Sequence, residues 1–533
     1  MSETADYIVV GAGSAGAVVA ARLAEAGANV TLLEAGAQAH QVAVRIPALY
    51  MNLMDSELDW GYRTVPQVEL NNRRIFLTRG RGLGGTSLMN AMVYMRGNRG
   101  DYDHWRDLGN EGWSYDDVLP LFKRSEHNQR LGEPFHGTSG GLMVSDQPAR
   151  NPLTEMFLEA CAENQMRWNE DVNGAEQEGY GYFQMTADSK GRCHTDRAFL
   201  EPVKHMPNLR IVTNALVTRI IVENGRAKGV EYVSGSSGHR LTAAAEIILC
   251  GGALNSPHLL MLSGIGPSAH LRGFDLKTEV DLPGVGQNLK DHLRIEYRCE
   301  IKQPLSLFGM SPAQADAATA QFLADGGGPF ASNYCEAGAF LRCNPAAAYP
   351  DVQVHFTPDF GPDRDDGETA DRHGFSMTIN VSRPKSRGEI RLRSADPYDK
   401  PGVDPRYLAD RSDLELTIDG LLACREIATS APFQKIGVRE IWPGEAAKSR
   451  ADLERFVRAM ASTIWHPSGS CKMGVDAAAV VDPKLRLHGV EGLRVADASI
   501  MPTLVSGNTN ATCIMIGEKA AELILQPTNA PGH

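Results

Sequence analysis

The chain has 533 residues, of which 42% are hydrophobic and 22% are charged, and its formal net charge is -12. This length exceeds a single ordinary core and predicts two to three domains of a soluble globular protein. The acidic balance argues against a nucleic-acid partner, because phosphates need a basic surface.

The start of the chain predicts neither a leader nor an anchor. The apolar residues 7–10 follow a short polar stretch and resemble the first strand of a fold, which leaves no room for a signal peptide. No apolar run reaches the ~18 residues of a membrane span. We therefore expect a cytoplasmic protein, with peripheral membrane contact left open. The nine cysteines include no Cys-x-x-Cys, so buried thiols are expected rather than disulfides or a metal site.

A strand, a glycine-rich turn, a helix and a second strand open the predicted fold. Residues 7–10 are apolar, residues 17–26 are rich in alanine, and residues 30–33 predict the second strand, which ends at Glu34. This order is that of a dinucleotide-binding unit, in which the acid accepts hydrogen bonds from an adenosine ribose. An acid would repel a 2′-phosphate, so NADP is disfavoured.

The residues of the turn have separate expected roles. Gly11 permits the tight turn, Gly13 lets a pyrophosphate approach the backbone, and Gly16 lets the helix and the strand pack closely. Ser14 and Ala15 stand at the expected helix N-terminus, which offers free N–H groups and a positive dipole end to phosphates. The motif predicts a bound dinucleotide without distinguishing FAD from NAD.

Two later glycine-rich stretches decide between the cofactors. Residues 80–94 begin Gly-Arg-Gly-Leu-Gly-Gly, a backbone that can press against a flat ring or a diphosphate. Residues 252–266 begin Gly-Ala-Leu-Asn-Ser-Pro and follow a predicted buried strand. In this order they resemble the two signature patterns of the glucose–methanol–choline (GMC) oxidoreductases. The resemblance covers nearly the whole chain, with further matches at residues 59–62, 281–286, 387–392 and 493–499.

The resemblance implies an α/β fold with two domains. One is a discontinuous, Rossmann-like FAD-binding domain, and the other is an α+β substrate-binding domain with an antiparallel sheet. We assign residues 1–155, 200–300 and 460–533 to the FAD-binding domain. Residues 156–199 and 301–459 form the substrate-binding domain, with a helix near residues 411–430 on its far side.

The resemblance also implies cofactor contacts. Gly85 belongs to the first signature, and Asn90 matches a residue beside the flavin. Val217 matches a strand position whose backbone contacts the adenine, and Asp497 matches a contact to the ribityl or phosphate region. Some members attach FAD through a histidine; Met89 occupies that position here, so FAD is expected to bind non-covalently.

The resemblance places the catalytic pair near the C-terminus. His466 matches the base, because imidazole titrates near neutrality and can remove the hydroxyl proton while a hydride leaves for flavin N5. Asn510 is expected to be its partner on the substrate oxygen. It is preferred to Asn508 because it directly precedes a helix predicted over residues 511–525, whose N-terminal end is expected to face the flavin.

Four residues are candidates for the substrate pocket. Glu336 and His355 match a carboxylate and a second histidine of choline-oxidising members, and Trp60 and Trp465 would add aromatic walls that suit a quaternary ammonium. Members with other substrates carry the same Glu and His, so structural groups at the pocket edge are an equal interpretation. His292 is expected to be structural.

Two segments of the middle region are expected to be surface loops or a lid. Residues 309–329 are rich in alanine, glycine and aspartate, and residues 359–374 hold a run of acidic residues without metal-ligand spacing.

The sequence thus predicts FAD-dependent oxidation of a small primary alcohol to an aldehyde, with further oxidation through the hydrate as an extension. Choline or sorbose-type dehydrogenation and alcohol oxidation by O2 are alternatives. A non-redox hydroxynitrile lyase or a flavin-binding module without activity is less favoured. A dehydrogenase that uses a quinone or another acceptor is slightly preferred to an oxidase, and the oligomeric state is not predicted.

Overall fold

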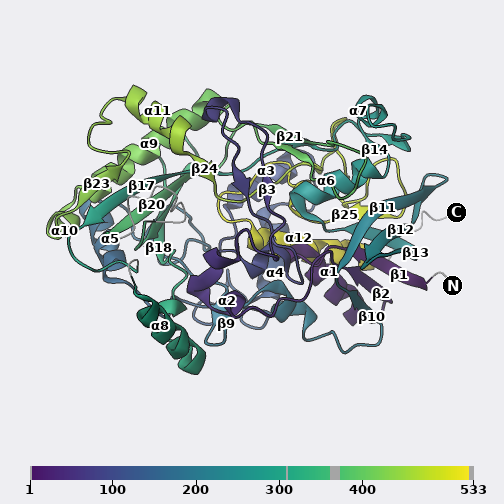
Figure 1. Ribbon diagram of the computed structural model, residues 1–533, viewed down its shortest axis with the longest axis horizontal. Helices are drawn as coiled ribbons and strands as arrows, with labels where there is room; N and C mark the ends of the chain where they lie inside the picture. The colour runs from purple at the N-terminus through teal and green to yellow at the C-terminus, as the bar shows by residue number, and fades with distance from the viewer. Residues whose placement is uncertain (1–2, 308–309, 361–371, 527–533) are drawn as a thin grey trace.

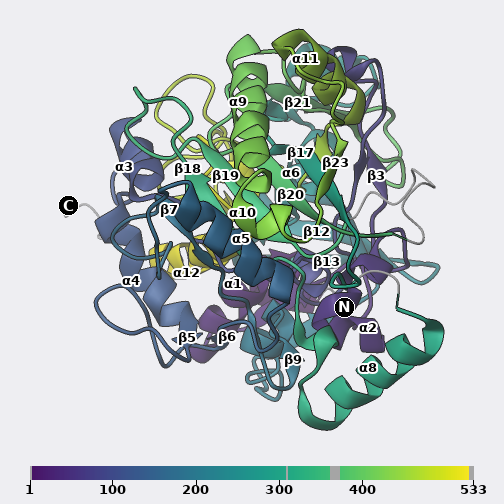
Figure 2. The ribbon, with the colours of Figure 1, turned by 90° about the vertical axis from the view of Figure 1, so that its left-hand side faces the viewer.

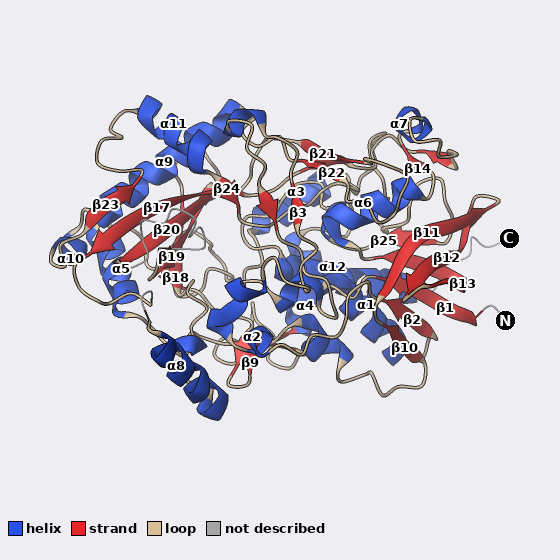
Figure 3. Ribbon diagram, viewed as in Figure 1, coloured by secondary structure: helices blue, strands red, loops and turns tan. Residues whose placement is uncertain are grey.

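The computed structural model describes residues 3–307, 310–360 and 372–526, which form two large sheets with helices packed between and around them (Figures 1 and 3). The first sheet has the order β10-β2-β1-β13-β12-β11, and β25 pairs with the end of β13. Its strands are β1 (Glu3–Val10), β2 (Val30–Leu33), β10 (Leu209–Val212), β11 (Ala215–Glu223), β12 (Arg226–Ser234), β13 (Ser237–Leu249) and β25 (Leu493–Val495).

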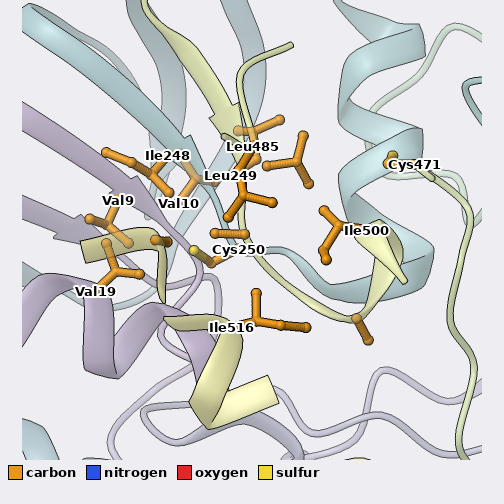
Figure 4. Packing of buried hydrophobic residues seen from close by; sticks show 14 of the residues in the cluster. Val9, Val10, Val19, Ile248, Leu249, Cys250, Cys471, Leu485, Ile500 and Ile516 are labelled. Atoms are coloured by element: carbon orange, nitrogen blue, oxygen red, sulfur yellow. The ribbon is translucent and has the colours of Figure 1, made fainter. Parts of the chain in front are cut away.

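One helix packs against the first sheet, and a second helix packs along the first. The helix α1 (Ser14–Glu25) packs along α12 (Asn510–Leu525), so that the first helix and the last helix of the described chain are neighbours (Figure 1). Figure 4 shows Val9, Val19, Ile248 and Ile516 filling the space between these helices and the strands. The strand–turn–helix–strand prediction for residues 7–34 is therefore confirmed, as is the C-terminal helix.

The second sheet is antiparallel and has the order β23-β17-β20-β19-β18-β7, with β24 also paired to β17. Its strands are β7 (Gly179–Tyr182), β17 (Leu293–Ile301), β18 (Ala337–Leu341), β19 (Val352–Thr357), β20 (His373–Val381), β23 (Arg439–Trp442) and β24 (Ser462–Thr463). Because β17 pairs here, it stands with the second sheet, although the predicted boundary placed it with the FAD-binding segments. The domain boundaries themselves stay a prediction.

The two faces of the second sheet differ in character. On β19, Val354 and Phe356 point into an apolar core that α5 (Pro152–Glu163), α9 (Arg411–Ala428) and α10 (Ala431–Gln434) cover (Figure 2). The alternating residues Gln353 and His355 are polar and buried on the opposite face. The predicted helix near residues 411–430 is α9, and the polar face roofs the site described below.

The segment expected to be a loop at 309–329 contains a helix. In α8 (Pro312–Asp325), the Ser311 hydroxyl caps the N-terminus in a capping box with Gln314, and Gly326 ends the helix with φ 74°. These local signals and the alanine content favour a helix, which extends away from the main body in Figures 1 and 2. The acidic residues 363–371 of the second expected loop lie outside the described residues.

The other elements connect these layers. Further helices are α2 (Val42–Arg45), α3 (Arg99–Asp107), α4 (Tyr115–Ser125), α6 (Gly252–Leu262), α7 (Ser268–Arg272) and α11 (Arg450–Met460). Short strands are β3 (Tyr62–Arg63), β4 (Phe76–Leu77), β5 (Glu126–Asn128), β6 (Leu142–Val144), β8 (Ala187–Asp188), β9 (Gly191–Arg192), β14 (Ile265–Gly266), β15 (Val280–Asp281), β16 (Gln287–Leu289), β21 (Gly388–Arg391) and β22 (Gly402–Asp404). Among the described residues, none of the helices combines the length and the apolar character needed to cross a bilayer.

Candidate active site

A first cavity lies at the carboxyl ends of three parallel strands. Val10, Leu33 and Leu249 are the last residues of β1, β2 and β13, and all three line it. Open α/β sheets bind nucleotides at this edge. Most of the predicted cofactor residues line the same cavity, namely Gly11, Gly13, Ser14, Ala15, Glu34, Gly85, Val217 and Asp497.

The glycine turn has the expected division of roles. Gly11 has φ 98°, and a Cβ on Gly16 would lie 1.9 Å from the Gly11 carbonyl oxygen, so that Gly16 serves helix packing and does not line the cavity. At Gly13 the nearest atom to an added Cβ is 4.0 Å away. A side chain at position 13 would therefore project into open space in the cavity, where the motif predicts the pyrophosphate.

The Glu34 carboxylate holds the glycine-rich turn in place through hydrogen bonds to its backbone. The carboxylate accepts hydrogen bonds from the backbone N–H groups of Ala12 (2.9 Å) and Gly36 (2.8 Å). Burial raises the pKa of Glu34, and these two N–H groups act against that shift. Glu34 thus braces the turn while it lines the cavity, and its contact with a ribose stays a prediction.

Two helix N-termini meet where the first cavity ends. Neither Gly13 before α1 nor Thr509 before α12 caps its helix with a side chain. The Ser14 hydroxyl donates a hydrogen bond to Asn510 Oδ1 (2.7 Å), which joins the two helix starts. Their unpaired N–H groups and positive dipole ends favour an anionic group between them.

A second cavity continues from the first. The residues that line both cavities are Ser14, Arg79, Thr86, Thr509 and Cys513. The residues present fit FAD, because an open glycine turn, two uncapped helix starts and a joined second cavity follow one another in space. The first cavity suits the nucleotide part, and the shared wall suits the flavin.

His466 stands in the second cavity and is largely buried. Its backbone N–H donates to Asp291 Oδ1 (2.7 Å), and its Nδ1 lies 2.9 Å from Nδ1 of His292. Burial is the main cause that lowers the pKa of His466 well below its ordinary value, and the neighbouring His292 and His355 add to it. The imidazole is therefore neutral at neutral pH and available as a base.

The structure places Asn508, and not the expected partner Asn510, in contact with the His466 ring. Nδ2 of Asn508 lies 3.4 Å from Nε2 of His466, whereas the Asn510 side chain is engaged by Ser14. Asn510 is the first residue of α12 and Asn508 lies in the preceding loop, and both line the second cavity. Because both asparagines line the second cavity, the partner of His466 stays a proposal, and the contact with His466 Nε2 favours Asn508.

The first signature contributes to the second cavity. Asn90 and Met89 both line it, and Asn90 Oδ1 accepts a hydrogen bond from Arg192 (2.8 Å). Met89 packs with its side chain buried. Asn90 is thus fixed in position at the second cavity, and its place beside the flavin stays a prediction.

Two of the four predicted pocket residues lie elsewhere. His355 and Trp465 line the second cavity, but Trp60 lines the first cavity, where Arg81 covers its ring at 5.1 Å. Glu336 is buried behind the pocket and does not line it. Its carboxylate accepts hydrogen bonds from Asn151 N (2.8 Å), Thr154 Oγ1 (2.7 Å) and Ser332 Oγ (2.7 Å). These contacts favour the structural role that the sequence left as an equal interpretation for Glu336.

Arg79 is a site residue that sequence reasoning missed. It is among the residues shared by the two cavities, and its guanidinium donates to the Trp465 carbonyl oxygen (2.7 Å) and to Thr86 Oγ1 (3.2 Å). Burial lowers its pKa. A single arginine before a glycine-rich stretch carries no recognisable pattern, so only the fold reveals its position.

Comparisons with known proteins show the family of the chain. Models of the GMC oxidoreductase family match residues 5–294 and 384–517. An alcohol dehydrogenase [acceptor] from Pseudomonas putida is 42% identical over 98% of this chain and 96% of its own length, and an oxygen-dependent choline dehydrogenase from Burkholderia cenocepacia (strain HI2424) is 42% identical over 97% and 93%.

Solved structures give the same result. The crystal structure of pyridoxine 4-oxidase from Mesorbium loti has a TM-score of 0.89 and 32% identity, covering 97% of this chain and 98% of that one. The GMC resemblance and the predicted fold class are confirmed. The chain belongs to the GMC oxidoreductase family and is an FAD-dependent oxidoreductase.

Proposed function

We propose that this enzyme oxidises an uncharged primary alcohol to the aldehyde, with His466 as the base and Asn508 as its partner. Oxidation of a CH–OH donor by FAD is the chemistry of the family. The observation that carries the proposal is the position of His466 Nε2 opposite Asn508 Nδ2, in a cavity that shares a wall with the nucleotide cavity.

His466 and Asn508 have different roles in the proposed reaction. FAD, when bound, supplies the hydride acceptor. The neutral imidazole of His466 takes the hydroxyl proton of the alcohol at Nε2, and the Asn508 amide donates a hydrogen bond to the same oxygen and orients it. His466 is buried and Asn508 is half-buried, and hydrogen bonds in such surroundings are stronger than in water.

Charge in the second cavity argues for an uncharged substrate. Among the described residues that line it, Arg79 and Arg294 are cations and Asp359 is an acid, while burial lowers the pKa of His355 to about 4. The Arg294 guanidinium forms an ion pair with the buried Glu296 carboxylate and lies 5.1 Å from the centre of the Trp465 ring. Arg294 already stacks on Trp465, and Arg79 adds a positive charge to the cavity wall, so choline is disfavoured although a relative is named for it. The apolar residues that line the cavity include Met51, Met54, Met92, Val93 and Ile464.

We also propose that FAD is held without a covalent bond and that electrons pass to a quinone or another acceptor rather than to O2. The thioether of Met89 supports the first point, since it cannot form the histidyl bond of some relatives. The second is supported by the Pseudomonas putida relative, whose name specifies an acceptor. The cytoplasmic location stays a prediction.

The test is an anaerobic absorbance titration of the purified yellow protein with butanol, benzyl alcohol, 5-hydroxymethylfurfural, choline, sorbose and mandelonitrile. We expect benzyl alcohol or another uncharged alcohol to bleach the flavin band, and choline to bleach it far less. Admitting air then distinguishes slow recolouring, expected of a dehydrogenase, from rapid recolouring with peroxide. Bleaching by choline alone, or cleavage of the nitrile without any bleaching by alcohols, would contradict the proposal.

A further inference from the structure

We infer that His292 is a positioning residue, which holds His466 in the tautomer whose Nε2 is free to accept the substrate proton. The inference rests on the proposed role of His466 as the base. His292 directly precedes β17 and is fully buried, and the sequence alone favoured a merely structural role for it.

The first step concerns the protons of His292. Its Nε2 lies 2.9 Å from the Ser382 carbonyl oxygen, and its Nδ1 lies 2.9 Å from Nδ1 of His466. A carbonyl oxygen only accepts hydrogen bonds, so Nε2 of His292 must carry a proton. Burial lowers the pKa of His292 to about 4, which leaves the ring with a single N–H at neutral pH. Nδ1 of His292 is then an acceptor.

The second step concerns which ring nitrogen of His466 carries the proton. Two ring nitrogens 2.9 Å apart need one proton between them, and His292 does not supply it. Nδ1–H of His466 is therefore the donor, and Nε2 of the same neutral ring carries no proton. That Nε2 faces the Asn508 amide nitrogen, which can only donate. Donors and acceptors thus run in one consistent direction from Asn508 to Ser382.

The third step concerns the reaction. A His466 ring with its proton on Nε2 could not take a proton from the alcohol, whatever its position in the cavity. A neutral His292 therefore performs the orienting task that a carboxylate performs beside many catalytic histidines. The backbone N–H of His466 fixes the loop through Asp291, so that the ring-to-ring contact is a separate constraint from the fold of the loop.

Two variants test this inference. His292→Asn keeps an acceptor oxygen near the position of Nδ1, and His292→Leu has a similar size without an acceptor. Anaerobic flavin reduction is measured over a range of concentrations of an alcohol that bleaches the unmodified enzyme. We expect His292→Leu to lower the limiting rate on the order of 10²-fold with a nearly unchanged half-saturating concentration, and His292→Asn to recover most of that rate. FAD content and melting temperature serve as controls for both variants.

Equal rates for the two variants, or an unchanged limiting rate in His292→Leu, would overturn the inference. If no alcohol bleaches the unmodified enzyme, the proposed function fails instead, so the two failures are distinguishable. A measurement independent of turnover is neutron diffraction of the holoenzyme in D2O. Deuterium on Nδ1 of His466 and on Nε2 of His292 is expected, and deuterium on Nε2 of His466 would refute the assignment even if His292→Leu does not fold.

Discussion

Asn508 and His466 face each other with Nδ2 of the asparagine 3.4 Å from Nε2 of the histidine. This separation is long for a hydrogen bond, and the Oδ1 atom of Asn508 is similarly distant from Nε2 of His355, at 3.3 Å. Catalytic hydrogen bonds are often loose before the substrate arrives. A substrate hydroxyl oxygen placed beside this pair, about 2.8 Å from each nitrogen, can bond to both side chains.

Replacing each of the two asparagines with alanine separates effects on catalysis from effects on cofactor binding. Asn508→Ala removes the donor that faces His466, so the limiting rate of flavin reduction should fall about 10- to 1,000-fold while FAD is retained. Asn510→Ala removes the partner of Ser14 at the joined helix starts and should weaken FAD retention more than the reduction rate. Stopped-flow reduction and flavin-to-protein absorbance ratios measure both effects. A larger rate loss in Asn510→Ala would restore the original assignment.

The rate of flavin reduction should be insensitive to pH around neutrality. His466 acts as a base only when it is unprotonated, and burial, followed by its histidine neighbours, lowers its pKa well below the usual ~6.5. Protonation then begins only at acidic pH, and the rate should fall there and not between pH 7 and 8. The pH profile of the second-order rate constant at low alcohol concentration measures this. A fall that already begins above pH 7 on acidification would contradict the lowered pKa.

Glu336 should affect stability and not substrate choice. Glu336→Ala leaves Asn151, Thr154 and Ser332 without their common acceptor in a buried place, which should lower the free energy of unfolding by about 1–3 kcal/mol. Thermal melting measures the loss. The ratio of half-saturating concentrations for choline and benzyl alcohol should remain the same as in the unmodified enzyme. A selective loss of choline binding would show that Glu336 reaches the substrate.

The parts of the site that depend on local backbone were predictable from the sequence. The roles of Gly11 and Gly16 follow from backbone geometry within one turn, and the spacing to Glu34 follows from one strand and one helix. The choice between Asn508 and Asn510 depends on where a loop points before a helix, which spacing along the chain does not encode. Glu336 shows the same limit, because its three partners come from a helix start, a helix and a loop that meet only in the folded chain.

Two glycines of the same motif should respond in opposite ways to an added methyl group. Gly13 has φ -75°, which alanine adopts, and an added Cβ meets nothing closer than 4.0 Å, so Gly13→Ala should fold normally. Its methyl group would occupy the space expected for the pyrophosphate, and FAD should be lost on purification or bind at least tenfold more weakly. Gly16→Ala places its Cβ 1.9 Å from the Gly11 carbonyl oxygen and should yield little folded protein.

The flavin-to-protein ratio and the melting temperature of each purified variant distinguish these effects. Gly27→Ala is a suitable control for loss of FAD during purification. Gly27 ends the same helix region and its added Cβ meets nothing within 4 Å, although its φ of 89° makes a modest loss of stability expected without loss of FAD. If Gly13→Ala held FAD as tightly as the unmodified enzyme, the pyrophosphate would have to lie away from the turn. The first cavity would then bind the cofactor by its other walls, and the glycine motif would serve packing alone.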